Sequence, residues 1–155
     1  KYDNLLVIRT FSKSRSMAGL RIGYAIGNKK LIKYMNDVKF SYNSYTMNMP
    51  SQILGAESLK DEAYFQSTVK KVIDTREWFM EEVLKLGFKC PKSSTNFLFM
   101  THKSIAANEI FEKAKAKKIY VRYFNRPRID NYLSVTVGTR EQMEIFLEFL
   151  KSLKV

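Results

Sequence analysis

A helical pattern that begins after Pro50 and runs to Gly87 constrains the fold of this chain more than any other feature. Pro50 stands where its missing amide hydrogen costs nothing. Gly87 is the natural stop, because glycine readily adopts the left-handed conformation that ends helices. The pattern weakens near "KDEAYF", so we expect a break there. A run this long divides the remaining elements into two groups, residues 1–67 and residues 68–155, and joins them without a flexible linker.

The first group has the pattern of the end of a parallel sheet with its helices. "NLLVI" (4–8) is a short continuous apolar run, typical of a strand buried on both faces in a parallel sheet. "RIGYAIG" (21–27) is a second strand candidate. Apolar residues recur at helical spacing over 28–40 and predict an amphipathic helix. Residues 41–50, rich in Asn, Ser and Tyr, predict a loop.

The second group predicts a small α/β unit. Strands are expected at 95–101, 119–124 and 132–137, with a helix over 104–118. In the last strand Leu133, Val135 and Val137 share one face, because side chains alternate along a strand. Thr139 and Gln142 have the spacing of a capping box at the start of a final helix. The expected buried stripe of that helix consists of Met143, Phe146, Leu147, Leu150 and Leu153.

Composition excludes several classes of function. The chain carries 27 basic and 15 acidic residues, a net charge of +12, which suits nucleic acid, a membrane surface or anionic small molecules. Its lysines are scattered over helical segments, and no known nucleic-acid-binding motif accompanies them. No apolar run approaches the roughly 18 residues of a membrane helix, and no signal peptide is evident, so we expect a cytoplasmic protein with no membrane or nucleic-acid partner.

Metal chemistry is also not expected. The chain has one cysteine and one histidine, which is too few for a Cys/His metal cluster. Cys90 is interpreted as a small buried hydrophobe, and His102 as a solvated loop residue.

The stretch "TFSKSRSMAGLRIG" (10–23) carries the strongest chemical signal. A neutral lysine amine attacks an aldehyde to give a Schiff base, which suits Lys13. Thr10, Ser12 and Arg21 offer the hydroxyl and guanidinium donors that bind phosphate. Pyridoxal 5'-phosphate carries both an aldehyde and a phosphate. Each residue alone is equally typical of a polar surface loop, and it is their order that favours the coenzyme site.

The same residues resemble a known family. "TFSKSRSMAG" looks like the lysine-attachment motif of class II, fold type I pyridoxal-phosphate-dependent aminotransferases. With "LRIG" it resembles the histidinol-phosphate aminotransferase branch, which acts in histidine biosynthesis. The likeness continues through "SSTNFLFM", "IYVRYF" and "YLSVTVGTREQM".

This resemblance implies a fold and roles for the residues. Residues 1–67 would be the C-terminal portion of the large coenzyme-binding domain, and residues 68–155 the small C-terminal α/β domain. Lys13 would be the Schiff-base lysine and the general base and acid of transamination with 2-oxoglutarate or glutamate. Ser12, Arg21 and, less surely, Thr10 would hold the coenzyme phosphate.

The resemblance also implies that part of the enzyme lies elsewhere. Family members carry an aspartate for the pyridine nitrogen and a phosphate loop upstream of the lysine, and Asp3 stands too close to Lys13 to be that aspartate. We therefore expect the chain to be a fragment that is inactive alone. The complete enzyme would be a homodimer with active sites at the subunit interface.

One substrate residue departs from the family pattern. Arg122 in "YVRYF" matches the first of two arginines that bind the anionic end of the substrate, but Ser134 occupies the position of the second. Losing a bidentate guanidinium weakens anion binding. Arg126 and Arg128 are close enough in sequence to compensate, although a solvated loop is the simpler interpretation.

Three alternatives remain open at this point. Two keep the coenzyme and change the reaction, namely an aromatic aminotransferase and a phosphothreonine decarboxylase of similar fold. The third is a basic nucleic-acid-binding module, which the charge and the nine tyrosines suggest but which leaves the order of residues in 10–23 unexplained.

Overall fold

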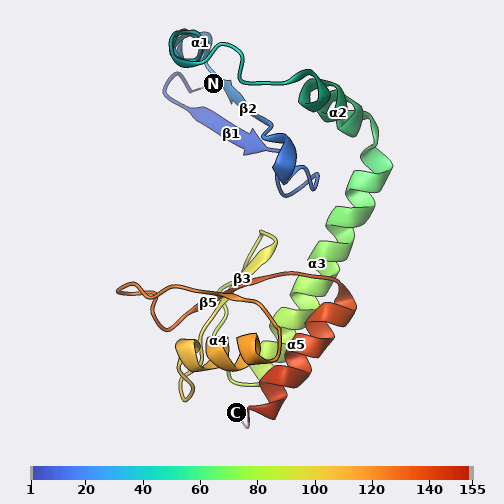
Figure 1. Cartoon of the computed structure of the whole chain (residues 1–155), viewed down its shortest axis with the longest axis vertical. Helices are drawn as coiled ribbons and strands as arrows, with labels where there is room; N and C mark the ends of the chain where they lie inside the picture. Colours follow the sequence, from blue (N-terminus) through green and yellow to red (C-terminus); the bar gives the residue numbers. More distant parts are fainter. Residues whose placement is uncertain (1, 154–155) are drawn as a thin grey trace. The chain divides into compact units, whose positions relative to one another are not determined.

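The computed structural model describes residues 2–153. The chain forms two compact units, Lys1–Ser67 and Thr68–Val155, and each has a sheet of its own. Both units combine helices with strands, so the expected α/β class is confirmed (Figure 1). The division between the units falls within helix α3, Glu62–Lys85, which is continuous across it.

The sheet of the first unit is an antiparallel hairpin. Strands β1 (Leu6–Thr10) and β2 (Gly23–Gly27) pair antiparallel, whereas the pattern of residues 4–8 had predicted a strand of a parallel sheet. The chain returns directly through the loop 11–22, and no crossover is available to make the strands parallel. The expected burial of residues 4–8 on both faces was also wrong, since β1 is mostly exposed in this chain.

Two capped helices complete the first unit. The side chain of Asn28 accepts a hydrogen bond from an amide in the first turn of α1 (Lys29–Tyr42). Asn48 does the same for α2 (Met49–Lys60), which carries Pro50 in its first turn. The predicted loop between these helices is present but shorter, because both helices extend into it. The predicted break is also confirmed, since α2 ends before Asp61 and α3 begins after it.

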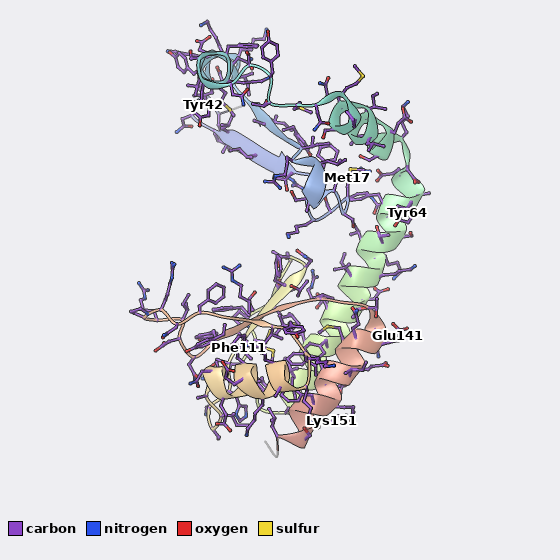
Figure 2. The ribbon with its side chains drawn as sticks, in the orientation of Figure 1. Met17, Tyr42, Tyr64, Phe111, Glu141 and Lys151 are labelled. Carbon is purple, nitrogen blue, oxygen red and sulfur yellow. The ribbon has the colours of Figure 1, made fainter. Side chains whose placement is uncertain are left out.

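The first unit has little core of its own. Phe11 and Ile22 are its buried apolar side chains. The hairpin, α1 and the following loop leave many large apolar side chains exposed, including Ile8, Ile26, Val38, Phe40, Tyr42 and Tyr45. Tyr42, labelled in Figure 2, is the last residue of α1 and is 92% exposed. Surfaces of this kind mark sites of contact with another surface.

The second unit has a three-stranded antiparallel sheet. Its strands are β3 (Phe97–Met100), β4 (Arg122–Tyr123) and β5 (Leu133–Thr136), in the order β3-β5-β4. Leu133, Val135 and Val137, which were predicted to share one face, are all buried, at 1%, 2% and 7% exposure. One face of the sheet therefore packs on the core, and the other carries the polar alternates of β5.

Helices bury the inner face of this sheet. Residues from α3, α4 (Ala107–Ala116) and α5 (Arg140–Ser152) join the strands in one apolar cluster. Phe79 of α3 and Phe146 of α5 stack with ring centroids 5.7 Å apart. The capping box of Thr139 and Gln142 is formed, as predicted. Gly87 follows α3 with φ of +85°, which confirms the expected helix stop.

Within residues 2–153, every helix is too short or too polar to cross a membrane.

Candidate functional site

Residues 10–23 form the closed end of the β1–β2 hairpin. Thr10 and Gly23 are cross-strand partners, and the Phe11 amide donates to the Ile22 carbonyl at 3.1 Å. A side chain at Gly23 would come within 2.9 Å of the Arg9 carbonyl oxygen, so this close pairing requires glycine. The strand pairing therefore holds the two ends of the loop together. It brings Ser12 and Arg21, which come one residue beyond the last ladder bond, to the same end of the hairpin.

The first half of the loop is a tight turn that begins at Lys13. The Lys13 carbonyl accepts a hydrogen bond from the Ser16 amide at 3.1 Å, and the Met17 amide donates to the Phe11 carbonyl at 3.1 Å. Ser16 has φ of +56°, in the left-handed region. Lys13 is exposed. Met17, labelled in Figure 2, lies in this loop just before the short 3₁₀ helix η1 (Ala18–Leu20).

The second half of the loop is fixed by Arg21 and by α2. Arg21 follows η1 with φ of +55°, and its Nη1 donates to the Ala18 carbonyl at 2.8 Å. Ser51 of α2 is buried, and its hydroxyl donates to the Leu20 carbonyl at 2.9 Å. Gly55, one turn along α2, leaves room for Ile22, because a Cβ there would meet the Ile22 side chain at 2.9 Å.

This end of the hairpin carries an amine that can react with an aldehyde and hydrogen-bond donors that can bind a phosphate. Lys13 supplies an amine, Thr10 and Ser12 supply hydroxyls, and Arg21 supplies an exposed guanidinium. The loop carries no acidic side chain to compete for these cations. The residues present therefore fit pyridoxal phosphate, because the amine and the hydrogen-bond donors for its phosphate lie at the same end of the hairpin. A reactive lysine is expected to be partly buried, whereas Lys13 is exposed in this chain.

A second group of sequence-predicted residues lies in the other unit. Arg122 of β4 and Ser134 of β5 are direct cross-strand partners on the outer face of the three-stranded sheet. Phe99 of β3 pairs with Ser134 from the other side. Arg122 is exposed, with its guanidinium 4.9 Å from the centroid of the Phe124 ring. The row Phe99, Ser134, Arg122 thus presents an aromatic ring, a hydroxyl and a cation side by side.

The two remaining arginines of this region lie in the β4–β5 loop. Arg126 and Arg128 are exposed, and Arg128 has φ of +74°. The solvated-loop interpretation therefore holds for these two residues within this chain.

His102 differs from its sequence prediction. It was expected in solvent, but it is 8% exposed and packs against Phe88, with ring centroids 4.9 Å apart. Its Nδ1 accepts the Ser104 amide at 3.2 Å. Gly87 is close to the ring, because a Cβ there would lie 3.1 Å from Nε2. The loop between β3 and α4 folds back over the end of α3, and a local sequence pattern does not show this.

Cys90 is half-buried rather than fully enclosed. Burial raises the pKa of its thiol above the ordinary value, and a backbone hydrogen bond from Phe99 partly offsets the effect. Within residues 2–153, no group of three or more His, Cys, Asp or Glu side chains is arranged to hold a metal ion.

Arg15 was not among the residues singled out from the sequence. Its guanidinium contacts Ser58, Glu62 and Phe65, all of which are more than 40 residues away along the chain. A single arginine in a polar loop gives no local signal of such contacts.

Comparison with known proteins identifies close relatives. The family described as "Aminotransferase class I and II" matches residues 1–150. A histidinol-phosphate aminotransferase of Brachyspira hyodysenteriae is 52% identical over 151 residues, which is 97% of this chain and 43% of that protein. The chain therefore spans less than half the length of the relatives it matches.

Solved structures share the fold. The histidinol-phosphate aminotransferase of Clostridium acetobutylicum superposes with a TM-score of 0.88 at 24% identity, covering 99% of this chain and 46% of that one. The enzyme of the same name from Sinorhizobium meliloti, solved in complex with pyridoxal-5'-phosphate, gives a TM-score of 0.83 at 21% identity, covering 97% and 42%.

Proposed function

Because the chain belongs to the class I and II aminotransferases, we propose that it is the lysine-bearing and small-domain part of a histidinol-phosphate aminotransferase. The observation that carries the proposal is the end of the β1–β2 hairpin, where an amine, two hydroxyls and a guanidinium occupy one loop. The names of the close relatives support the choice of reaction.

Lys13, Ser12 and Arg21 have distinct roles in this proposal. When bound, pyridoxal phosphate supplies the aldehyde and the electron-withdrawing ring that make the substrate's carbon acidic. Lys13 Nζ would hold the coenzyme through its aldehyde, and the same amine would accept the proton from the substrate carbon and later return it. Ser12, Arg21 and Thr10 bind the coenzyme phosphate.

Arg122 binds the anionic end of the amino substrate. We propose histidinol phosphate and 2-oxoglutarate, or the reverse pair with glutamate, as the substrates of the complete protein. Ser134, directly opposite Arg122, offers a neutral hydroxyl where the resemblance expects a second arginine. The complete protein would act as a cytoplasmic homodimer.

The exposed apolar surface of the first unit supports a larger parent protein. Large apolar side chains line both the hairpin and α1, and a free surface of this extent is unusual for a monomer. In the proposal, the remainder of the large domain and a second subunit cover it. We expect the 155-residue chain alone to bind coenzyme weakly and to show no turnover, and turnover by this chain alone would contradict that.

The test is made on the complete protein mixed with pyridoxal phosphate. We expect an absorbance band that borohydride fixes onto the peptide containing Lys13, and Lys13→Ala should lose both the band and activity. Lys33→Ala, which removes an exposed lysine paired with Asp37 on α1, should retain both. A yellow, fully active Lys13→Ala protein would overturn the assignment.

Product analysis separates the alternative reactions. Transfer of the amino group to 2-oxoglutarate is expected, whereas release of carbon dioxide would indicate a decarboxylase. Steeply salt-dependent binding to DNA or RNA would favour the nucleic-acid alternative.

A further inference from the structure

Arg15 occupies a corner of the turn that begins at Lys13. The hydrogen bond from the Ser16 amide to the Lys13 carbonyl closes a four-residue turn, with Ser14 and Arg15 at its two central positions. A turn of this kind has few ways to move if one corner is fixed. Lys13 is the first residue of this turn, so contacts that fix Arg15 also restrain the backbone next to Lys13.

The side chain of Arg15 is held on three sides. Its Nη1 donates to the Ser58 carbonyl, and its Nη2 lies 3.4 Å from Glu62 Oε2. The guanidinium carbon lies 4.1 Å from the centroid of the Phe65 ring. The Arg15 side chain is only 13% exposed, although it belongs to an exposed loop.

These three contacts join the turn to the junction of α2 and α3. Ser58 lies in the last turn of α2, where the carbonyl groups lack helical partners and a cation is favourable. Glu62 begins α3, and Asp61 between the helices accepts the Tyr64 amide at 3.2 Å. Tyr64 is labelled beside this junction in Figure 2.

Arginine suits this position better than lysine. Its planar fork reaches a carbonyl and a carboxylate at once, while its face packs on an aromatic ring. A lysine ammonium would reach one of the two oxygens and would not stack.

We propose that Arg15 is a positioning residue for Lys13. By clamping the corner of the turn to the α2–α3 junction, it fixes the backbone from which the Lys13 amine is presented. The inference rests on the function proposed above for Lys13, because only a reacting amine needs its position held this closely. A misplacement of about 1 Å at a reacting group costs on the order of 100-fold in rate.

The chain offers a matched control. Arg140 on α5 has contacts of the same kind, with Nε 3.0 Å from Glu144 Oε1 and its guanidinium carbon 3.4 Å from the centroid of the Trp78 ring. Removing either arginine deletes a stacked guanidinium and an ion pair. Arg15→Ala should cost more stability, because Arg15 also donates to the Ser58 carbonyl and its side chain is 13% exposed against 46% for Arg140. The comparison therefore concerns the 11–17 segment and Lys13, which only the Arg15 variant should affect.

The first measurement needs no coenzyme. In the complete apoprotein, we expect Arg15→Ala to speed hydrogen exchange of the 11–17 segment by about 10-fold or more, because the turn opens more often. Arg140→Ala should leave exchange in that segment unchanged.

The second measurement uses the complete protein loaded with pyridoxal phosphate. We expect Arg15→Ala to lower kcat by about 10- to 100-fold with little change in KM, and to shift the pH midpoint of the coenzyme absorbance band. Arg15→Lys should recover part of kcat. The milder Phe65→Leu and Glu62→Gln variants, which keep the arginine, should each show a smaller change in the same direction.

The outcomes separate the two proposals. If Arg15→Ala matches Arg140→Ala in exchange, kcat and pH midpoint, the positioning role is wrong. If Arg15→Ala does not fold, unchanged kcat and pH midpoint in both milder variants would likewise overturn it. If Lys13→Ala still retains coenzyme and turns over, the proposed function fails instead, whatever Arg15 does.

Discussion

Replacing Ser134 by arginine tests whether the outer face of the second unit's sheet binds an anion. Ser134 and Arg122 are direct partners across the β4–β5 ladder, so Ser134→Arg places a second guanidinium beside the first. Side chains in such a pair have Cβ atoms about 4.5 to 5.5 Å apart. Both guanidinium groups would therefore reach the same phosphate or carboxylate.

Two opposing free energies decide the result. Two like charges about 5 Å apart repel by about 0.8 kcal/mol in bulk water and by about 3 kcal/mol at the effective dielectric constant near a protein surface, which lowers the stability of the free protein. A new hydrogen-bonded contact to an anion contributes about 1.5 to 3 kcal/mol. Because the bound anion relieves this repulsion, the repulsion does not subtract from the gain on binding. We expect kcat/KM for histidinol phosphate to rise by about 10- to 150-fold.

The assay compares histidinol phosphate with histidinol in the complete protein. Histidinol lacks the phosphate, so its kcat/KM should change little. Thr136→Arg is the matched control, because Thr136 lies on the same outer face but opposite Phe97 rather than Arg122. It should raise kcat/KM for histidinol phosphate by less than about 3-fold. No gain in the Ser134→Arg protein, or an equal gain for both substrates, would show that the anion is bound elsewhere.

Three further predictions concern the stability and packing of the second unit. Thr139→Ala removes the capping hydroxyl of α5 and should lower the free energy of unfolding by about 1 kcal/mol, measured by urea titration; an unchanged midpoint would contradict the role of the cap. Gly87→Ala should cost about 1 to 2 kcal/mol because of its positive φ and its approach to His102, whereas Gly19→Ala, with open space around it, should cost less. Because burial raises the pKa of the Cys90 thiol, its thiolate fraction at any pH below that pKa is smaller than that of a free cysteine. Its alkylation by iodoacetamide should therefore reach half-maximal rate at a higher pH than for a free cysteine, and a lower midpoint would refute the burial.

Elements with strong local signals could be predicted from the sequence. The capping pair that starts α5, the alternation of Leu133 and Val135 in β5 and the glycine that ends α3 each depend on neighbours within a few residues. Local rules of this kind suffice where propensity, pattern and burial agree.

Features that depend on distant contacts could not be predicted. The run at residues 4–8 has the composition of a doubly buried strand, but its pairing is antiparallel and its faces are open in this chain. His102 is buried because a loop folds over Gly87, and its own neighbours in sequence do not indicate this. Arg15 contacts residues 43 and 47 positions away.

The candidate site also has parts that local sequence predicts and parts that depend on distant contacts. Its members Ser12, Lys13 and Arg21 were chosen from one short motif, and as coenzyme ligands they stay predictions. The direct opposition of Arg122 and Ser134 required the β4–β5 register, which a single sequence does not specify when a strand is only two residues long.

The β1–β2 hairpin has a practical consequence for anyone who isolates this chain. Within residues 2–153, neither outer edge of the hairpin meets another strand. Branched side chains such as Ile8 and Ile26 project from the two faces of the hairpin and are 65% and 61% exposed. The unpaired backbone groups of an open edge can bond to a strand of another copy. Copies of the isolated chain should therefore aggregate by forming a shared sheet.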